Sequence, residues 1–141
     1  MFDNLRRHGK EFGIIFGDRT LLSNSRLSLE ASEFARDMGK YGEFHEQIFH
    51  AYFTEAMDIG SAEILCDIAS GCGLDGTDLM HALKDGRYKL RLDKARNEGL
   101  KIQLTSVPTF IINDKHKIVG AQPIKSFTDI LDKIAKAIIC N

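Results

Sequence analysis

Apolar residues recur every three or four positions through the first two thirds of the chain, and glycines interrupt the pattern. This spacing predicts a series of amphipathic helices. A glycine that follows such a segment commonly marks the end of a helix, because glycine adopts the left-handed conformation needed there without strain. The expected helices cover approximately residues 4–12, 24–38, 42–57, 61–72, 75–85 and 88–98, and five of them end at Gly13, Gly39, Gly73, Gly86 and Gly99.

The hydrophobic pattern changes after Gly99. Residues 107–113 form a short β-branched and aromatic stretch that a turn-forming Asn-Asp pair ends, and residues 117–120 follow as a second strand. Pro123 then opens a closing helix with a continuous apolar stripe from Phe127 to Ile138. The sequence therefore predicts an α+β fold in which a β-hairpin and a C-terminal helix follow a run of helices.

The first strand of the expected hairpin is apolar on both faces. Val107, Thr109 and Ile111 alternate with Phe110 and Ile112, and neither set is strongly polar. Such a strand normally lies in the middle of a sheet that is covered on both sides. The sequence offers one partner strand for it, so we expect an exposed edge on which a further strand can pair.

Composition restricts the function classes. The length of 141 residues is typical of a single domain. The content of 43% hydrophobic and 28% charged residues is typical of a globular protein. Nineteen Lys and Arg against 20 Asp and Glu provide no basic surface for a nucleic acid. No apolar run could span a membrane, and no secretory signal follows Met1, so we expect a cytoplasmic protein. We also expect no cofactor.

The cysteines are Cys66, Cys72 and Cys140, and no C-x-x-C motif occurs. Cys66 is predicted to be a small buried hydrophobic residue, and Cys72 to be partly exposed at a helix end. A reactive thiol needs a lowered pKa, which the N-terminus of a helix or a paired cysteine usually provides. None of the three has such a position in the sequence, so we expect no catalytic residue in this chain.

Other polar clusters favour structural interpretations. His45 and His50 lie close to Glu43 and Glu46 in sequence, but the spacing supplies no third ligand, which favours a solvated helix face over a metal site. The basic residues between positions 84 and 94 are balanced by acidic ones and predict a solvated surface. The aromatic residues expected mainly in the core are Phe44, Phe49, Tyr52 and Phe53.

Several motifs, in the same order, resemble those of DsbA-like thioredoxin-fold proteins. Residues 24–40 (NSRLSLEASEFARDMGK) resemble the helical-insertion signature, and residues 44–53 (FHEQIFHAYF) with Asp-Ile at 58–59 resemble the next helix and turn. Residues 106–112 (SVPTFII) resemble the cis-proline strand, and residues 119–123 (VGAQP) the turn into the final helix. Within this family the motifs resemble most the branch that includes the FrnE-type oxidoreductases of polyketide clusters.

The resemblance implies an incomplete thioredoxin fold. Family members begin with a β-strand, a C-x-x-C motif at a helix N-terminus and a second strand, and this sequence is expected to begin after them. Residues 1–100 then form mostly the helical insertion, and residues 101–141 the ββα half. The implied function is that of a thiol–disulfide oxidoreductase, inactive in this form.

The same resemblance implies where a substrate binds. The residue before the cis-proline offers its backbone to an extended peptide, so Val107, Pro108 and Thr109 are the implied substrate-binding residues. The expected partner is a thiol-containing peptide or a small-molecule thiol. A second copy of the chain is also an expected partner, because two copies can pair their exposed strand edges in a homodimer.

Two alternatives remain open. The 2-hydroxychromene-2-carboxylate isomerases and the kappa-class glutathione transferases share the helical insertion and use glutathione, although the Gly-Ala-Gln-Pro turn favours the FrnE-like branch. The other alternative is a non-catalytic module that binds a strand at its open sheet edge.

Overall fold

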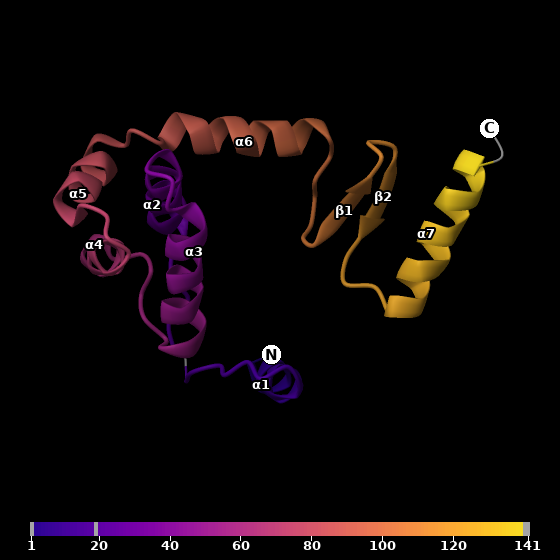
Figure 1. Cartoon of the computed structure of the whole chain (residues 1–141), viewed down its shortest axis with the longest axis horizontal. Helices are drawn as coiled ribbons and strands as arrows, with labels where there is room; N and C mark the ends of the chain where they lie inside the picture. Colours follow the sequence, from indigo (N-terminus) through magenta and orange to yellow (C-terminus); the bar gives the residue numbers. More distant parts are fainter. Residues whose placement is uncertain (1, 19, 140–141) are drawn as a thin grey trace. The chain divides into compact units, whose positions relative to one another are not determined.

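The computed structural model describes residues 2–18 and 20–139 (Figure 1). The chain divides into two compact units, Met1–Lys94 and Ala95–Asn141, and the helix over Lys89–Lys101 continues across the division. The elements are α1 (Phe2–Glu11), α2 (Arg26–Asp37), α3 (Tyr41–Phe49), the π-helix η1 (His50–Thr54), α4 (Ala62–Gly71), α5 (Gly76–Asp85), α6 (Lys89–Lys101), β1 (Thr109–Ile112), β2 (His116–Val119) and α7 (Ile124–Ile139).

Most of the predicted helix ends are confirmed. Four of the five glycines that were expected to end helices have positive φ angles between 63° and 74°. The prediction for Gly99 is wrong, because α6 continues through it to Lys101. Instead Gln103 adopts a φ of 54°, and the amide of Leu104 donates to the Gly99 carbonyl at 2.9 Å. This is the Schellman arrangement that glycine usually forms, made here by a glutamine.

The predicted helix over residues 42–57 is two elements in the structure. After α3 the backbone widens into η1, where the amide of Glu55 donates to the carbonyl of His50 at 3.1 Å, five residues back. The apolar spacing continues without interruption, so the sequence pattern could not distinguish this π-helix from a continued α-helix. Short π-helical turns inside helices frequently accompany functional sites.

Side-chain caps fix the starts of two helices, at the residues where the sequence predicted helices to begin. The Ser61 hydroxyl accepts from an amide in the first turn of α4, and the Asp75 carboxylate accepts from two amides of α5. Helix α2 begins later than expected, with Ser25 at the N-cap position. The side chain of Asn24 accepts from the amide of Arg26 at 3.0 Å, which orders the residues before the helix.

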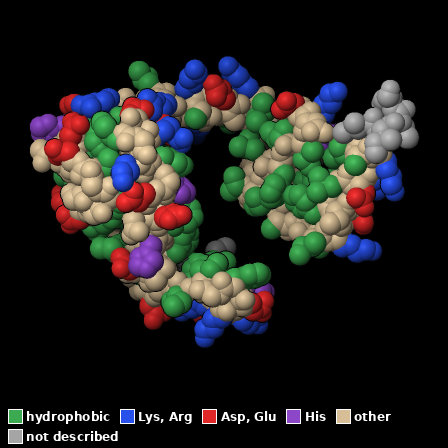
Figure 2. All heavy atoms as spheres, in the orientation of Figure 1, with side chains coloured by type: hydrophobic (Ala, Val, Ile, Leu, Met, Phe, Trp, Pro, Cys, Tyr) green, Lys and Arg blue, Asp and Glu red, His purple; other side chains and the backbone are tan. Residues whose placement is uncertain are grey.

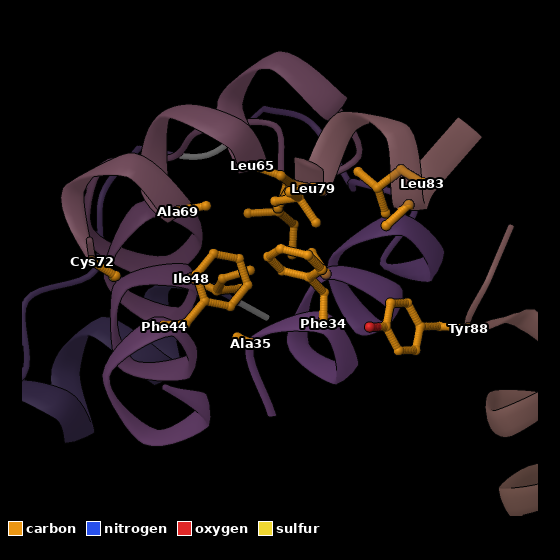
Figure 3. Close-up of a cluster of buried hydrophobic side chains, with 13 residues drawn as sticks. Phe34, Ala35, Phe44, Ile48, Leu65, Ala69, Cys72, Leu79, Leu83 and Tyr88 are labelled. Carbon is orange, nitrogen blue, oxygen red and sulfur yellow. The ribbon is translucent and has the colours of Figure 1, made fainter. Parts of the chain in front are cut away.

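The helical unit has its own hydrophobic core, built where α2, α3, α4 and α5 pack against one another (Figure 3). Phe34, Phe44 and Leu65 are buried at its centre, and each side chain is at most 1% exposed. The apolar faces predicted from helical spacing supply these residues. The core consists of Ala31, Phe34, Ala35, Phe44, Ile48, Ile59, Leu65, Ala69, Cys72, Leu79, Ala82, Leu83 and Tyr88.

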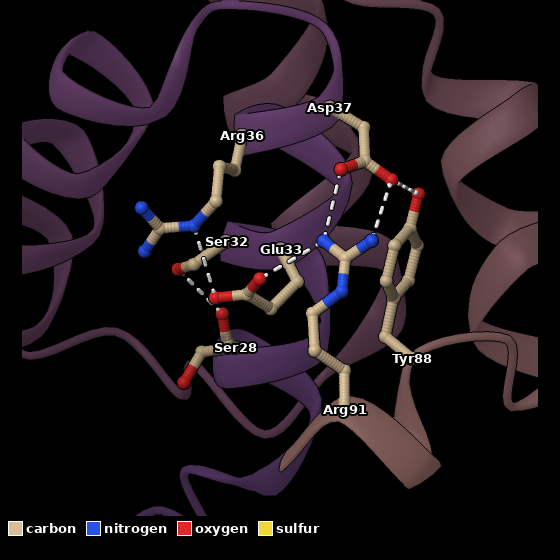
Figure 4. A network of polar contacts seen from close by, with 7 residues as sticks. All are labelled: Ser28, Ser32, Glu33, Arg36, Asp37, Tyr88 and Arg91. Carbon is tan, nitrogen blue, oxygen red and sulfur yellow. Dashed lines mark hydrogen bonds and ion pairs between the residues drawn. The ribbon is translucent and has the colours of Figure 1, made fainter. Parts of the chain in front are cut away.

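A polar network joins α2 to the start of α6 (Figure 4). The Arg91 guanidinium donates to Asp37 at 2.9 and 3.2 Å and to Glu33 at 3.0 Å, and the Tyr88 hydroxyl donates to Asp37 at 3.1 Å. The hydrogen bonds from Arg91 lower the pKa of the Asp37 carboxyl below its usual value. The basic segment at positions 84–94 is therefore not simply a solvated surface, because Arg91 pairs with carboxylates on a neighbouring helix.

The second unit contains a two-stranded antiparallel hairpin and α7. Within residues 2–18 and 20–139, β1 and β2 are the strands of the sheet, paired from Thr109 with Val119 to Ile112 with His116. The ring of Phe110 meets that of Phe127 on α7 edge-on, with centroids 4.7 Å apart. Figure 2 shows hydrophobic side chains gathered on the surface of this unit. Among the described residues, no helix is both long and apolar enough to cross a membrane.

Candidate functional site

The residues that resemble the family's substrate loop lie together at the start of β1. The Val107–Pro108 peptide bond is cis, as the resemblance implied. The Thr109 hydroxyl donates to the carbonyl of Ser106 at 2.6 Å, which closes the loop on its own backbone. The Val107 side chain is 83% exposed, so the loop presents an apolar side chain to solvent.

The pairing of the hairpin determines which backbone groups of β1 are free. The amide of Gly120 donates to the Pro108 carbonyl at 2.8 Å, so this pair is of the hydrogen-bonded type. Hydrogen-bonded pairs alternate along an antiparallel ladder, which directs the amide and carbonyl of Phe110 toward β2. The amides and carbonyls of Thr109 and Ile111 therefore face the other edge of β1, where no described strand pairs with them.

Helix α7 packs on one face of the hairpin, and the other face is more exposed to solvent. Phe110 and Ile118 lie on the face that α7 covers, and Ile118 is buried. The opposite face carries Ile111 and Val119, which are both more than two-fifths exposed. On that face the Lys117 ammonium donates to the carbonyls of residues 102 and 103 at 3.1 and 2.5 Å, and so binds the C-terminal end of α6. The free edge of β1 thus combines unpaired backbone groups with exposed apolar side chains.

The two described cysteines are poor nucleophiles. Cys66 is half-buried in α4, and Cys72 is buried at the C-terminal end of that helix, so the predicted order of their exposure is wrong. Burial raises the pKa of both thiols, and nearby carboxylates raise it further, Asp67 for Cys66 and Glu43 for Cys72. A reactive thiol requires the opposite shift. Cys140 lies outside the described residues.

The two histidines near Glu43 and Glu46 have structural contacts. The ring of His45 stacks between those of Tyr41 and Phe49, with centroids 5.2 and 4.6 Å away. His50 Nδ1 lies 3.6 Å from a carboxylate oxygen of Glu55. Over residues 2–18 and 20–139, no group of three or more His, Cys, Asp or Glu side chains could hold a metal ion.

Of the aromatic residues expected in the core, Phe44 is fully buried, as predicted. Phe49 is not a core residue, since half of its side chain is exposed. It belongs to a row of rings along one side of α3 and η1, which Tyr41 begins and Phe53 ends. The i,i+4 spacing of this row was visible in the sequence, but it did not reveal that the row lies at the edge of the core.

Comparison with known proteins identifies the family. The model of the DSBA-like thioredoxin domain matches residues 1–132. The chain belongs to the DSBA-like thioredoxin domain family. A crystal structure of a probable DsbA oxidoreductase from Streptomyces coelicolor superposes on this DsbA-like chain with a TM-score of 0.77 at 23% identity, over 93% of this chain and 57% of that one. The structural match shows the DsbA-like fold, as predicted.

Two curated relatives extend the comparison. The uncharacterized protein YwbO of Bacillus subtilis is 34% identical over 89 residues, which are 62% of the DsbA-like chain and 44% of YwbO. The thiol:disulfide interchange protein DsbA of Pseudomonas aeruginosa is 26% identical over 80 residues, 57% of this chain and 38% of that protein. The matched region of the DsbA-like chain therefore spans less than half the length of each relative.

Proposed function

We propose that this chain serves thiol–disulfide exchange by binding an extended peptide along the free edge of β1, with Val107, Pro108 and Thr109 as the binding loop. The observation that carries the proposal is the outward-facing backbone of Thr109 and Ile111 beside the exposed Val107. An extended peptide that adds to such an edge gains main-chain hydrogen bonds irrespective of its sequence. This suits a protein whose relative is named for thiol:disulfide interchange.

The exchange chemistry itself needs a reactive thiol, which neither of the two described cysteines provides. In thiol–disulfide exchange a thiolate attacks one sulfur of a disulfide, and the other sulfur leaves as a thiolate. Cys66 and Cys72 have raised pKa values, and no C-x-x-C motif occurs in the 141 residues. We therefore assign peptide binding to the loop of Val107, Pro108 and Thr109. We assign the exchange reaction to a dithiol other than the three cysteines of this sequence.

The branch within the family is part of the proposal. The Gly-Ala-Gln-Pro turn at 120–123 favours the FrnE-like oxidoreductases over the glutathione-dependent isomerases and transferases. In the structure the Gln122 amide donates to the Val119 carbonyl at 2.9 Å, which gives this glutamine a role in the turn after β2. Retention of the chain on immobilised glutathione would contradict this assignment.

The test of peptide binding uses two proline substitutions on opposite edges of the hairpin. Ile111→Pro removes an outward amide at the free edge of β1, and Val119→Pro removes one at the outer edge of β2. The ligand is the thiol-free peptide acetyl-Thr-Val-Ser-Val-Thr-amide, and its affinity is measured by calorimetry. We expect Ile111→Pro to weaken binding by about fivefold or more, since one hydrogen bond contributes about 1 kcal/mol, and Val119→Pro to leave it unchanged.

Two results would overturn the proposal. Equal binding by the wild type and Ile111→Pro, with both hairpins intact by NMR, would place the peptide elsewhere. Acceleration of insulin reduction by the 141-residue chain, lost when its cysteines are changed to serine, would show that its own thiols perform exchange.

A second candidate function rests on the same free edge. Two copies of the chain could pair their β1 strands antiparallel about a two-fold axis, which would make a symmetric dimer with a continuous sheet. Sedimentation velocity over a hundredfold dilution, on the order of 1 to 100 µM to cover typical weak association, tests this candidate. A dimer that Ile111→Pro disrupts supports it, and a monomer throughout excludes it.

A further inference from the structure

The helical unit contains a hollow that the proposed function does not use. It has a volume of about 460 Å³ and lies between α1, the segment that follows α1, and the junction of α3 with η1. Its lining includes Leu5, Ile14, Phe16, Phe49 and Phe53. Hollows of roughly 300 to 1,000 Å³ with mostly apolar linings are typical of small-molecule sites.

The π-helix builds one wall of this hollow. Two hydrogen bonds fasten the segment after α1 to η1: the amide of Gly17 donates to the Phe53 carbonyl at 2.8 Å, and the Thr54 hydroxyl donates to the Ile15 carbonyl at 3.0 Å. A Cβ atom at Gly17 would lie 2.2 Å from the carbonyl oxygen of Thr54, so only glycine permits this approach. The wall is thus held by specific contacts between segments far apart in sequence.

The chemistry of the lining favours an uncharged aromatic ligand. Phe16 meets Phe53 edge-on at a centroid distance of 5.9 Å, and Phe49 lies 5.4 Å from Phe53. Half of the Phe49 side chain remains exposed, so it retains surface on which another ring can pack. Aromatic rings prefer offset or edge-to-face neighbours at such distances. The lining contains no Lys, Arg, Asp or Glu, which leaves an ionic ligand without a partner.

His50 adds one polar feature to the lining. Its Nδ1 lies 3.6 Å from a carboxylate oxygen of Glu55, which is longer than a hydrogen bond, so this contact does not engage the ring as a hydrogen bond would. A neutral imidazole ring has one nitrogen that accepts a hydrogen bond. We propose that this hollow binds a small uncharged aromatic molecule that carries one hydrogen-bond donor, of the indole or phenol class.

The experiment compares two probes that differ only in the donor. Indole and 1-methylindole are titrated into the ¹⁵N-labelled 141-residue chain, and amide shifts are followed by NMR. We expect saturable shifts centred on Leu5, Ile14, Phe49 and His50, and about fivefold tighter binding of indole, the effect of one hydrogen bond. Absence of saturable binding, or shifts centred elsewhere in the chain, would overturn the proposal.

Matched variants separate the ring contact from the donor contact. Phe49→Ala should weaken binding of both probes by about fivefold or more, whereas Leu29→Ala removes an equally exposed side chain outside the lining and should change nothing. Ile14→Ala shortens a side chain on the wall that faces η1 and lies outside any helix, and it should also weaken binding of both probes. His50→Phe should make the two probes bind equally. If Phe49→Ala and Ile14→Ala bind indole as the wild type does, or if His50→Phe still prefers indole, the assignment is wrong.

Discussion

The core of the helical unit makes a quantitative prediction for Leu65→Ala. Leu65 lies on α4 and is 0% exposed within the hydrophobic cluster. The substitution removes three buried carbon atoms, which corresponds to about 2.4 kcal/mol at roughly 0.8 kcal/mol per methylene group. The cavity left behind adds to this loss, so we expect the free energy of unfolding to fall by about 3 kcal/mol.

The assay follows tyrosine fluorescence during urea unfolding. The chain has no tryptophan, and its three tyrosines, Tyr41, Tyr52 and Tyr88, all lie in the helical unit, so the signal reports that unit alone. With a denaturant dependence of roughly 1 to 3 kcal/mol per molar urea, the midpoint should fall by about 1 to 3 M. Leu29→Ala is the control, because Leu29 is half-exposed on α2. Equal midpoints for the two variants would refute the central packing of Leu65 in the core.

Three further predictions follow from individual contacts. Asp75→Ala removes the carboxylate that accepts from the amides of Thr77 and Asp78 at 2.8 and 3.0 Å. In the same assay it should lower the free energy of unfolding of the helical unit by about 1 kcal/mol. An unchanged urea midpoint would contradict the role of Asp75 as a cap. Native alkylation by iodoacetamide, read by mass spectrometry, should modify Cys66 before Cys72, which is 3% exposed, and equal rates would contradict that burial. Because Arg91 lowers the pKa of folded Asp37, the unfolded state takes up the proton first on acidification. Stability should therefore fall as the pH drops through the usual value of 3.8 toward the lower folded value, and Asp37→Asn should weaken this dependence.

Local signals in the sequence predict much of the fold because they act through a few neighbouring residues. A glycine after an apolar-periodic stretch ends a helix by taking a positive φ, as Gly86 does. The same signal fails at Gly99, where the helix continues and Gln103 takes the positive φ instead. Glycine permits the left-handed conformation but does not impose it. The Val107–Pro108 cis bond was expected from the family resemblance and not from local propensity.

Features that depend on packing between distant segments were not predictable. The burial of Cys72 and the partial exposure of Cys66 depend on which side of α4 meets the core. The pairing of Arg91 with Asp37 joins residues 54 positions apart, and no local pattern specifies it. The π-helix preserves the apolar spacing of α3, so its wider turn left no mark in the sequence. The free edge of β1, in contrast, was predictable, because one apolar strand had a single partner strand.

The central claim is that the free edge of β1 binds an extended peptide. The most direct test is to titrate the thiol-free peptide acetyl-Thr-Val-Ser-Val-Thr-amide into the ¹⁵N-labelled chain and to map the amide shifts. The outward amides of Thr109 and Ile111 should shift most and become protected from hydrogen exchange, while those of Phe110 and Ile112, already bonded within the hairpin, should change less. Binding that leaves the amides of β1 unperturbed, or no binding at all, would contradict the account.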